Sequence, residues 1–222
     1  MIEAVVFDLD GLLIDTEQVW DEVREALVRE RGGRWHNRAQ ADMMGMSSTE
    51  WSRYLHEELG LAEAPGELNR RVVERMQARY REQLPVLPGA VRAVRRLSEH
   101  WVLGLASSSN RPLIDLALEE MGVAGLFRAT VSSEEVERGK PAPDVYLESA
   151  RRLGIPAERI VALEDSANGI RSAAAAGMHV IAIPNVHFPP PEEVLAQADA
   201  RLASLAELTP DVVESASSRR GP

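Results

Sequence analysis

Short apolar runs separated by longer amphipathic segments make up the hydrophobic pattern of this chain. The first run, Ala-Val-Val-Phe at residues 4–7, is followed by two acidic residues and a glycine, which is typical of a buried strand. Four later runs have the same character. The predicted strands are Ala4–Phe7, Val102–Ala106, Ala129–Ser132, Ile160–Leu163 and Val180–Ile183.

Helical patterns lie between the later apolar runs, and each of three helices is predicted to stop at a glycine. These glycines are Gly122, Gly154 and Gly177. Strands that alternate with helices in this way need crossover connections, and these connections are right-handed. The pattern therefore predicts an α/β fold with a doubly wound parallel sheet.

The segment between the first strand and about Leu84 contains only helical patterns. Trp20 begins an apolar series at helical spacing, and Ser47 with Glu50 has the spacing of a capping box that opens a second helix. A third helical pattern follows Pro65. We therefore predict an α-helical cap domain at residues 15–84, inserted after the first strand.

The remaining residues, 1–14 and 85–222, are predicted to form one discontinuous core domain with a Rossmann-like sheet. The last residues, Ser215–Pro222, are small, polar and basic, and we predict that they form a frayed tail. A chain of 222 residues is long enough for one core of ordinary size and a small second lobe.

Composition narrows the possible partners. The net charge of −10 argues against non-specific nucleic-acid binding, which needs surplus Lys and Arg. No apolar run approaches the roughly 20 residues that span a bilayer, and acidic residues interrupt the N-terminal apolar stretch, so we expect neither a membrane partner nor a signal peptide. The absence of Cys excludes disulfides and fits a reducing compartment. We expect a cytoplasmic monomer.

Chemically active residues follow four of the predicted strands. They are Asp8 and Asp10 after the first, Ser107, Ser108, Ser109 and Asn110 after the second, Lys140 in the loop after the third, and Glu164 and Asp165 after the fourth. In an open parallel sheet, ligands bind beyond the carboxyl ends of the strands. We therefore expect all four clusters to meet at one edge.

The residue types at this edge complement one another. Carboxylates and other oxygen donors suit a hard cation such as Mg²⁺. Hydroxyls, backbone N–H groups at a helix start and a Lys suit a phosphate group. A metal ion, a Lys and N–H donors together are what phosphoryl transfer requires, because its transition state spreads negative charge over three oxygens.

Four motifs in order resemble the haloacid dehalogenase superfamily. They are Phe-Asp-Leu-Asp-Gly, the Ser after the second strand, Gly-Lys-Pro-Ala-Pro-Asp and Leu-Glu-Asp-Ser. The helical insert resembles the cap that this superfamily carries just after its first motif. The resemblance covers nearly the whole chain and implies a phosphatase that uses an aspartyl-phosphate.

The resemblance assigns a role to each acidic residue. Asp8 is expected to be the nucleophile, and Asp10 the general acid that protonates the leaving alcohol and then the base that activates water. Asp8, the carbonyl of Asp10 and Asp165 are expected to hold Mg²⁺. Glu164 is either a fourth metal ligand or a residue just outside the ligand set. Glu164 and Asp165 are also consistent with a helix N-terminal cap.

The resemblance also implies a phosphate site. Ser107 and Lys140 are expected to bind the transferred phosphoryl group, with backbone N–H groups around Ser108 and Ser109. The alternatives from the residues alone are a helix-capping role for Ser107 and a solvated loop position for Lys140.

Within the superfamily, the motifs favour hydrolysis of sugar phosphates. Dehalogenases lack the second aspartate, which is present here as Asp10, and phosphonate hydrolases use a cap lysine, whereas residues 15–84 contain no Lys. In β-phosphoglucomutase, a His stands at the position of Trp20 and an Arg at that of Ser48. The absence of both argues for a phosphatase, with a sugar phosphomutase and a non-catalytic ligand-binding protein as the alternatives.

The stretch that starts at Asp10 resembles bacterial hexitol and 2-deoxyglucose-6-phosphate phosphatases most. We therefore expect a small phosphorylated metabolite, either a hexose or a hexitol phosphate, as the substrate. The candidate substrate-binding residues are Glu17, Trp20, Asn110 and Arg111. Trp20 is expected either to stack on the sugar or to pack within the cap. Arg111 is either a pocket residue or a surface charge at a helix start.

Overall fold

The protein forms a single sheet of parallel strands covered by helices on both faces. The computed structural model describes residues 1–43, 46–186 and 188–217. The strand order is β3-β2-β1-β4-β5-β6, and each neighbouring pair is parallel. The strands are β1 (Ala4–Phe7), β2 (Val102–Ser107), β3 (Phe127–Ser132), β4 (Ile160–Glu164), β5 (His179–Ala182) and β6 (Ala200–Arg201).

The sheet confirms the predicted fold class and the five predicted strands, and it adds β6 at the edge. Strand β6 is only two residues long and pairs with Ile181 and Ala182 of β5, so it has no apolar run that a sequence pattern could reveal. Strand β1 lies at the centre, between β2 and β4, and all four of its side chains are buried. This position brings the end of β1 next to the ends of two other strands.

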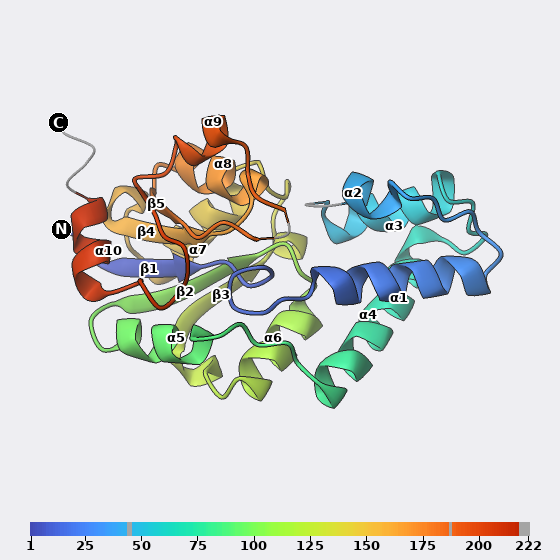
Figure 1. Cartoon of the computed structure of the whole chain (residues 1–222), viewed down its shortest axis with the longest axis horizontal. Helices are drawn as coiled ribbons and strands as arrows, with labels where there is room; N and C mark the ends of the chain where they lie inside the picture. The colour runs from blue at the N-terminus through green and yellow to red at the C-terminus, as the bar shows by residue number, and fades with distance from the viewer. Residues whose placement is uncertain (44–45, 187, 218–222) are drawn as a thin grey trace.

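Alternate side chains of β1 enter two different hydrophobic layers. Val5 and Phe7 belong to the layer that also contains residues of α5, α6 and α10, whereas Ala4 and Val6 belong to the layer formed with α7, α8 and α9. Figure 1 shows α5 and α6 on one side of the sheet and α8 and α9 on the other. These helices are α5 (Ala90–Ser98), α6 (Arg111–Glu120), α7 (Asp144–Leu153), α8 (Ala167–Ala175), α9 (Glu192–Leu195) and α10 (Pro210–Ala216).

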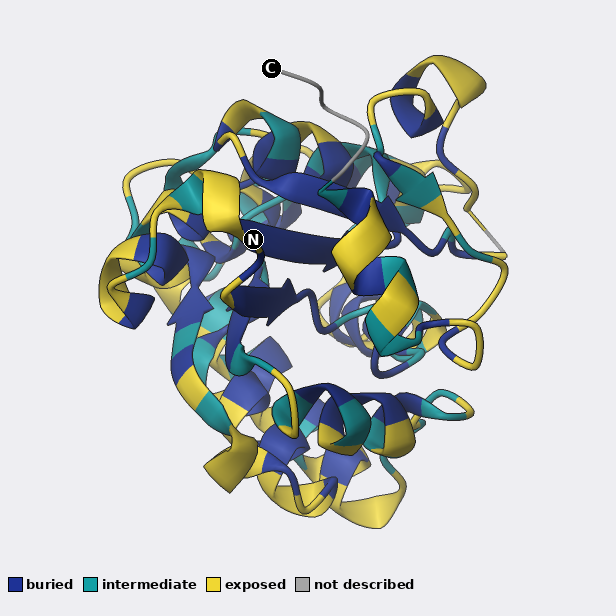
Figure 2. Ribbon diagram, turned by 90° about the vertical axis from the view of Figure 1, so that its left-hand side faces the viewer, coloured by how far each residue is buried: buried dark blue, intermediate teal, exposed yellow. Residues whose placement is uncertain are grey.

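Short 3-10 turns, and glycines in the left-handed backbone conformation, connect these elements. The turns are η1 (Ala124–Leu126), η2 (Ser133–Glu135) and η3 (Ala157–Arg159). Gly122, Gly154 and Gly177 have φ values of 64°, 72° and 81°, a conformation that favours glycine, and each lies just after a helix as predicted. In Figure 2 the central strands are buried, while the outward faces of many helices are exposed.

The inserted segment forms a helical lobe beyond one end of the sheet, at the right of Figure 1. Its helices are α1 (Glu17–Glu30), α2 (Ala39–Met43), α3 (Ser48–Glu57) and α4 (Pro65–Glu82). The predicted capping box at the start of α3 is confirmed, because Ser47 and Glu50 exchange hydrogen bonds between side chain and backbone. None of the helices described in the structure is both long and apolar enough to cross a membrane.

The lobe is joined to the sheet by two chain segments that run side by side. The backbone N–H of Asp15 donates to the carbonyl of Pro85 at 2.8 Å, and the N–H of Leu87 donates to the carbonyl of Leu13 at 2.9 Å. The chain therefore leaves the core and returns to it at the same place. This place matches the predicted boundaries at residues 14 and 85, and the division into core and cap domains stays a prediction.

The predicted frayed tail at Ser215–Pro222 is wrong for its first residues. Helix α10 continues to Ala216, whose side chain is 1% exposed, and Val213 is fully buried. Arg96 of α5 donates to the carbonyl of Leu208, just before α10. The helix is therefore docked on the core by apolar contacts, and residues 218–222 lie outside the described residues.

We predict that Val213→Ala destabilises the protein by about 2 kcal/mol, because it removes buried methyl groups and leaves a cavity. The matched control is Glu214→Ala, next to it on the exposed face of α10. Urea unfolding followed by circular dichroism measures both. Identical midpoints for the two variants and the parent would show that α10 does not dock.

Candidate active site

The carboxyl ends of β1, β2 and β4 meet at the edge of the sheet that faces the helical lobe. Asp8 directly follows β1, and its backbone N–H donates to the carbonyl of Leu163 in β4 at 3.0 Å. A cavity of about 260 Å³ lies between this edge and the lobe. Residues from both parts line it, and those from the lobe are Glu17, Trp20, Arg24, Met43, Met46 and Trp51.

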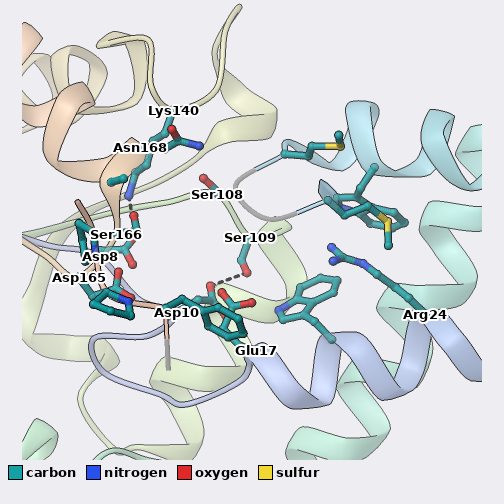
Figure 3. A pocket seen from close by; sticks show the side chains of 18 of the residues that line it. Asp8, Asp10, Glu17, Arg24, Ser108, Ser109, Lys140, Asp165, Ser166 and Asn168 are labelled. Carbon is teal, nitrogen blue, oxygen red and sulfur yellow. Dashed lines mark hydrogen bonds and ion pairs between the residues drawn. The ribbon is translucent and has the colours of Figure 1, made fainter. Parts of the chain in front are cut away.

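Lys140 is the buried cation of this edge. Its Nζ atom donates to Asp8 Oδ1 at 2.6 Å, to Glu164 Oε1 at 2.6 Å and to the backbone carbonyl of Ala106 at 3.0 Å. The Lys140 side chain is only 4% exposed, so water screens these contacts little. The ammonium therefore ties together the ends of β1, β2 and β4. Figure 3 shows its contact with Asp8.

The charges at this edge are unbalanced in favour of the carboxylates. Burial raises the pKa of Asp8 from 3.8 to about 8 although Lys140 lowers it, and Glu164 and Asp10 raise it further. Burial, Asp8 and Glu164 raise the pKa of Asp165 well above its ordinary value. Burial lowers the pKa of Lys140, but the carboxylates outweigh this and the net shift is upward. The single positive charge of Lys140 therefore cannot neutralise all of the carboxyl groups around it.

A group of carboxylate oxygens at this edge could hold a metal ion. Asp8, Glu164 and Asp165 each offer an oxygen within 4.8 Å of the others, and all three residues are buried. Asp165 Oδ1 is buried without a hydrogen-bond partner in the described part of the chain. A buried carboxyl oxygen without a partner is costly unless a cation or a proton compensates it. These donors fit a hard divalent cation.

Both carboxylate oxygens of Glu164 already accept hydrogen bonds from buried groups of the protein. Its Oε1 accepts from Lys140 and, at 2.6 Å, from the Tyr146 hydroxyl, while its Oε2 accepts from the backbone N–H groups of Asp165 and Ser166 at 3.1 and 3.4 Å. These bonds favour the second of the two predicted roles, outside the ligand set. Glu164 is suited to fix Lys140 and, through it, Asp8.

Two glycines make room for these carboxylates. A Cβ atom at Gly169 would lie 1.9 Å from the Glu164 carboxylate, and one at Gly11 would lie 2.0 Å from Asp165 Oδ2. Gly11 also has a φ of 85°, which other residues rarely adopt. The glycine of the first motif is therefore required both by the turn after Asp10 and by the close approach of Asp165.

Asp10 points toward the cavity and is fixed by hydroxyl groups. Thr16 Oγ1 donates to its Oδ1 at 2.5 Å, and Ser109 Oγ donates to its Oδ2 at 2.6 Å. Ser108 and Ser109 line the cavity, whereas Ser107 is fully buried beneath it, 3.4 Å from Asp10 Oδ2. The hydroxyl of Ser107 accepts the backbone N–H of Ser109 at 3.0 Å, so it shapes the serine loop from below.

Glu17 and Trp20, two of the candidate substrate-binding residues, line the cavity from the first turns of α1. Burial and the charge of Asp10 raise the pKa of Glu17 from 4.5 to about 7, although Arg24 lowers it. Trp20 also packs against Trp51, with ring centroids 6.0 Å apart. Both of its predicted roles are thus compatible with its position, because one part of the indole packs in the lobe and another part faces the cavity.

Asn110 and Arg111 do not join the cavity wall. The Asn110 amide donates to Asn69 of α4 at 3.0 Å and to Glu134 at 2.6 Å. The Arg111 guanidinium donates to Glu135 and to Thr130 Oγ1, on the flank of β3. Neither residue is among those that line the cavity, and Arg111, at the start of α6, is half-buried in ion pairs with Asp115 and Glu135.

Glu134 connects the core to the helical lobe. Its Oε1 accepts from Ser48 Oγ of α3 at 3.1 Å and from Asn110, and its Oε2 accepts the backbone N–H of Arg111 at 3.0 Å. We call these contacts of Glu134, together with the Asn110–Asn69 hydrogen bond, the Glu134 bridge. The bridge spans the gap between lobe and core beside the cavity.

Several residues of the site lie outside the sequence motifs. Tyr146 contacts Glu164 from α7, and Phe188 lines the cavity from the loop after β5. Arg24 lines the cavity at the end opposite Asp8 and Asp165 (Figure 3). The spacing of Arg24, four residues after Trp20 and seven after Glu17, was the available signal, because these positions share one helix face.

Comparisons with known proteins give matches over most of the chain. The family described as haloacid dehalogenase-like hydrolase matches residues 5–183. Hexitol phosphatase B of Escherichia coli (strain K12) is 37% identical over 94% of this chain and 95% of its own length. The phosphorylated carbohydrates phosphatase of Thermotoga maritima is 30% identical over 81% of this chain and 84% of its own length.

A solved structure has the same overall arrangement. The crystal structure of CbbY from Rhodobacter sphaeroides in complex with phosphate superposes with a TM-score of 0.86 at 27% identity, and covers 96% of this chain and 100% of that chain. The match of the family extends over strands β1 to β5, the helical lobe and all four motifs, and it ends before β6. The chain belongs to the haloacid dehalogenase-like hydrolase family.

Proposed function

We propose that the protein is a Mg²⁺-dependent phosphatase that hydrolyses small phosphomonoesters, with hexose or hexitol phosphates as its substrates. The observation that carries the proposal is the buried cluster of Asp8, Lys140, Glu164 and Asp165, which opens with Asp10 onto one cavity. The sugar-phosphate class is supported by the relatives, two of which are phosphatases of hexitols and of phosphorylated carbohydrates.

The proposed reaction has two displacement steps at phosphorus. A carboxylate oxygen of Asp8 attacks, the bond between phosphorus and the ester oxygen breaks, and Asp10 gives its proton to the leaving alcohol. Water then attacks the aspartyl-phosphate, Asp10 accepts its proton, and inorganic phosphate leaves with the Asp8 carboxylate restored. The hydroxyls of Thr16 and Ser109 orient Asp10 for both transfers.

Other groups of the site act on the phosphoryl oxygens. Lys140, which is bound to Asp8, and the backbone N–H of Ser108 on the cavity wall are proposed to stabilise their negative charge, whereas the N–H of Ser109 is already donated to Ser107 Oγ. Asp8, Asp165 and the carbonyl of Asp10 are the proposed Mg²⁺ ligands, and the orphaned Asp165 Oδ1 supports this set. When bound, the cation supplies positive charge that keeps Asp8 ionised and neutralises the phosphoryl group.

We predict that Asp8→Asn abolishes phosphate release, with at least a 10³-fold loss of kcat, because an amide cannot act as the nucleophile. The assay measures inorganic phosphate from hexose, hexitol, pentose and nucleoside phosphates, with Mg²⁺ or EDTA. Asp115→Asn, an exposed substitution on α6, is the control.

Three outcomes of this assay contradict the proposal. Isomerised sugar phosphate without phosphate release would indicate a phosphomutase. No turnover of any ester would indicate a ligand-binding protein. Equal release from Asp8→Asn and the parent would place the chemistry elsewhere.

We predict that Mg²⁺ raises the melting temperature more at pH 8 than at pH 6. Because the pKa of Asp8 is raised from 3.8 to about 8, the folded metal-free protein keeps a proton there and loses stability as pH rises through this range. A cation must displace that proton at pH 6 but competes with it less at pH 8. Thermal shift assays measure the effect.

The control for this prediction is Asp165→Asn, which should remove most of the Mg²⁺-dependent shift at both pH values. A shift that is equal at pH 6 and pH 8, or that persists in Asp165→Asn, would contradict the assigned ligands.

We further propose that the lobe is a cap that opens to admit substrate, with hinges at residues 15–16 and 84–85. Glu134→Ala is predicted to speed limited proteolysis of these linkers two- to fivefold, because it removes the hydrogen bond of Glu134 to Ser48 of α3. Glu137→Ala, nearby on the same loop, is the control. Mg²⁺ with a phosphate analogue should protect the linkers, and identical cleavage under all conditions would refute the hinge.

A further inference from the structure

Three residues of α1 form a stripe along one wall of the cavity. Glu17, Trp20 and Arg24 all line it, and their spacing places them on the same face of the helix. With a rise of about 1.5 Å per residue, Arg24 lies roughly 10 Å further along the helix axis than Glu17. Figure 3 shows the Arg24 side chain reaching into the cavity from the side opposite Asp8 and Asp165.

The guanidinium of Arg24 lies against two indole rings. Its Cζ atom lies 4.5 Å from the ring centroid of Trp20 and 4.8 Å from that of Trp51, and these rings come from α1 and α3. Arg24 is 6% exposed. Contacts of this kind orient the planar guanidinium without using its N–H donors. The donors therefore stay available for a ligand.

Arg24 lacks an ion-pair partner within the described ranges. No carboxylate oxygen of these residues lies within 4.0 Å of its nitrogens, and its Nε is buried without a hydrogen bond. Burial lowers its pKa to about 10, which still leaves it charged at neutral pH, and the carboxylates of Glu17, Asp10 and Asp21 act on it only from a distance. A buried cation without a direct partner is costly, and a ligand anion would offset that cost.

The surroundings favour an anion over a neutral hydroxyl as the occupant. The indoles of Trp20 and Trp51 lie against the guanidinium, and the apolar side chains of Met43 and Met46 line the same cavity. In an apolar environment, a charge-assisted hydrogen bond to carboxylate or phosphate is stronger than one to a hydroxyl, and the guanidinium presents paired donors that match both anions.

We propose that Arg24 determines specificity by binding a second acidic group of the substrate, a carboxylate or a phosphate, at the end opposite the transferred phosphoryl group. The proposal rests on the phosphatase function proposed above, because it places the transferred phosphate at Asp8. Among hexose and hexitol phosphates and their acid derivatives, it favours those that carry a second acidic group, namely phosphorylated sugar acids and sugar bisphosphates.

The test uses binding, so that it does not depend on turnover. Calorimetry with the Asp8→Asn variant and Mg²⁺ compares two matched pairs of ligands, 6-phosphogluconate with sorbitol 6-phosphate and fructose 1,6-bisphosphate with fructose 6-phosphate. The acidic member of at least one pair is expected to bind tenfold or more tightly. The pair that shows the preference tells whether carboxylate or phosphate is the second group.

Additional substitutions assign the preference to Arg24. Adding Arg24→Met to Asp8→Asn should reduce the preference to less than twofold, whereas Arg24→Lys should retain part of it because a cation remains. Arg29→Met, which changes an exposed arginine of the same helix, should leave the preference unchanged. Melting temperatures check that each variant is folded, and Arg24→Lys keeps the test valid where Arg24→Met does not fold.

Equal affinities within both pairs, including no binding of any of the four ligands, would overturn the proposal. A preference that survives Arg24→Met in the folded protein would also overturn it. Failure of the phosphatase function is seen separately, as absence of phosphate release from the parent protein. Phosphate release without any Arg24-dependent preference would overturn this inference alone.

Discussion

The buried ammonium of Lys140 is the interaction on which the arrangement of the site depends. A charge in this position needs partners on several sides, and it finds them in Asp8, Glu164 and the carbonyl of Ala106. These three partners stand at the ends of β1, β4 and β2, so the register of the central strands and the orientation of the proposed nucleophile are set together. Residue 169 must be a glycine for the same reason, because any side chain there would displace Glu164 from Lys140.

Much of the fold could be predicted because its signals are local. The five strands of the core are apolar runs, and the capping box of Ser47 marks the start of α3 in four residues of sequence. Strand β6 carried no such signal, since two residues show no period and their pairing with β5 depends on the finished sheet. Helix α10 was missed for a related reason: Val213 and Ala216 are buried only because the core already offers a surface to them.

The residues of the candidate site that directly follow a strand could be predicted from the sequence. Asp8, Lys140 and Asp165 come together because parallel strands end at one edge. Side-chain direction was not predictable in this way, and Arg111 follows the serine loop in sequence yet turns toward β3. Arg24 escaped notice because the face of α1 that meets the cavity is fixed only by the packing of the lobe.

The two indoles beside Arg24 have a spectroscopic consequence. Trp20 and Trp51 belong to different helices of the lobe, and both lie on the cavity wall next to a cation. They are two of only four tryptophans in the chain, so they contribute a large share of its intrinsic fluorescence. The polarity around these rings changes when a solute replaces water in the cavity. The protein therefore carries its own optical reporter of whether the far end of its cavity is filled.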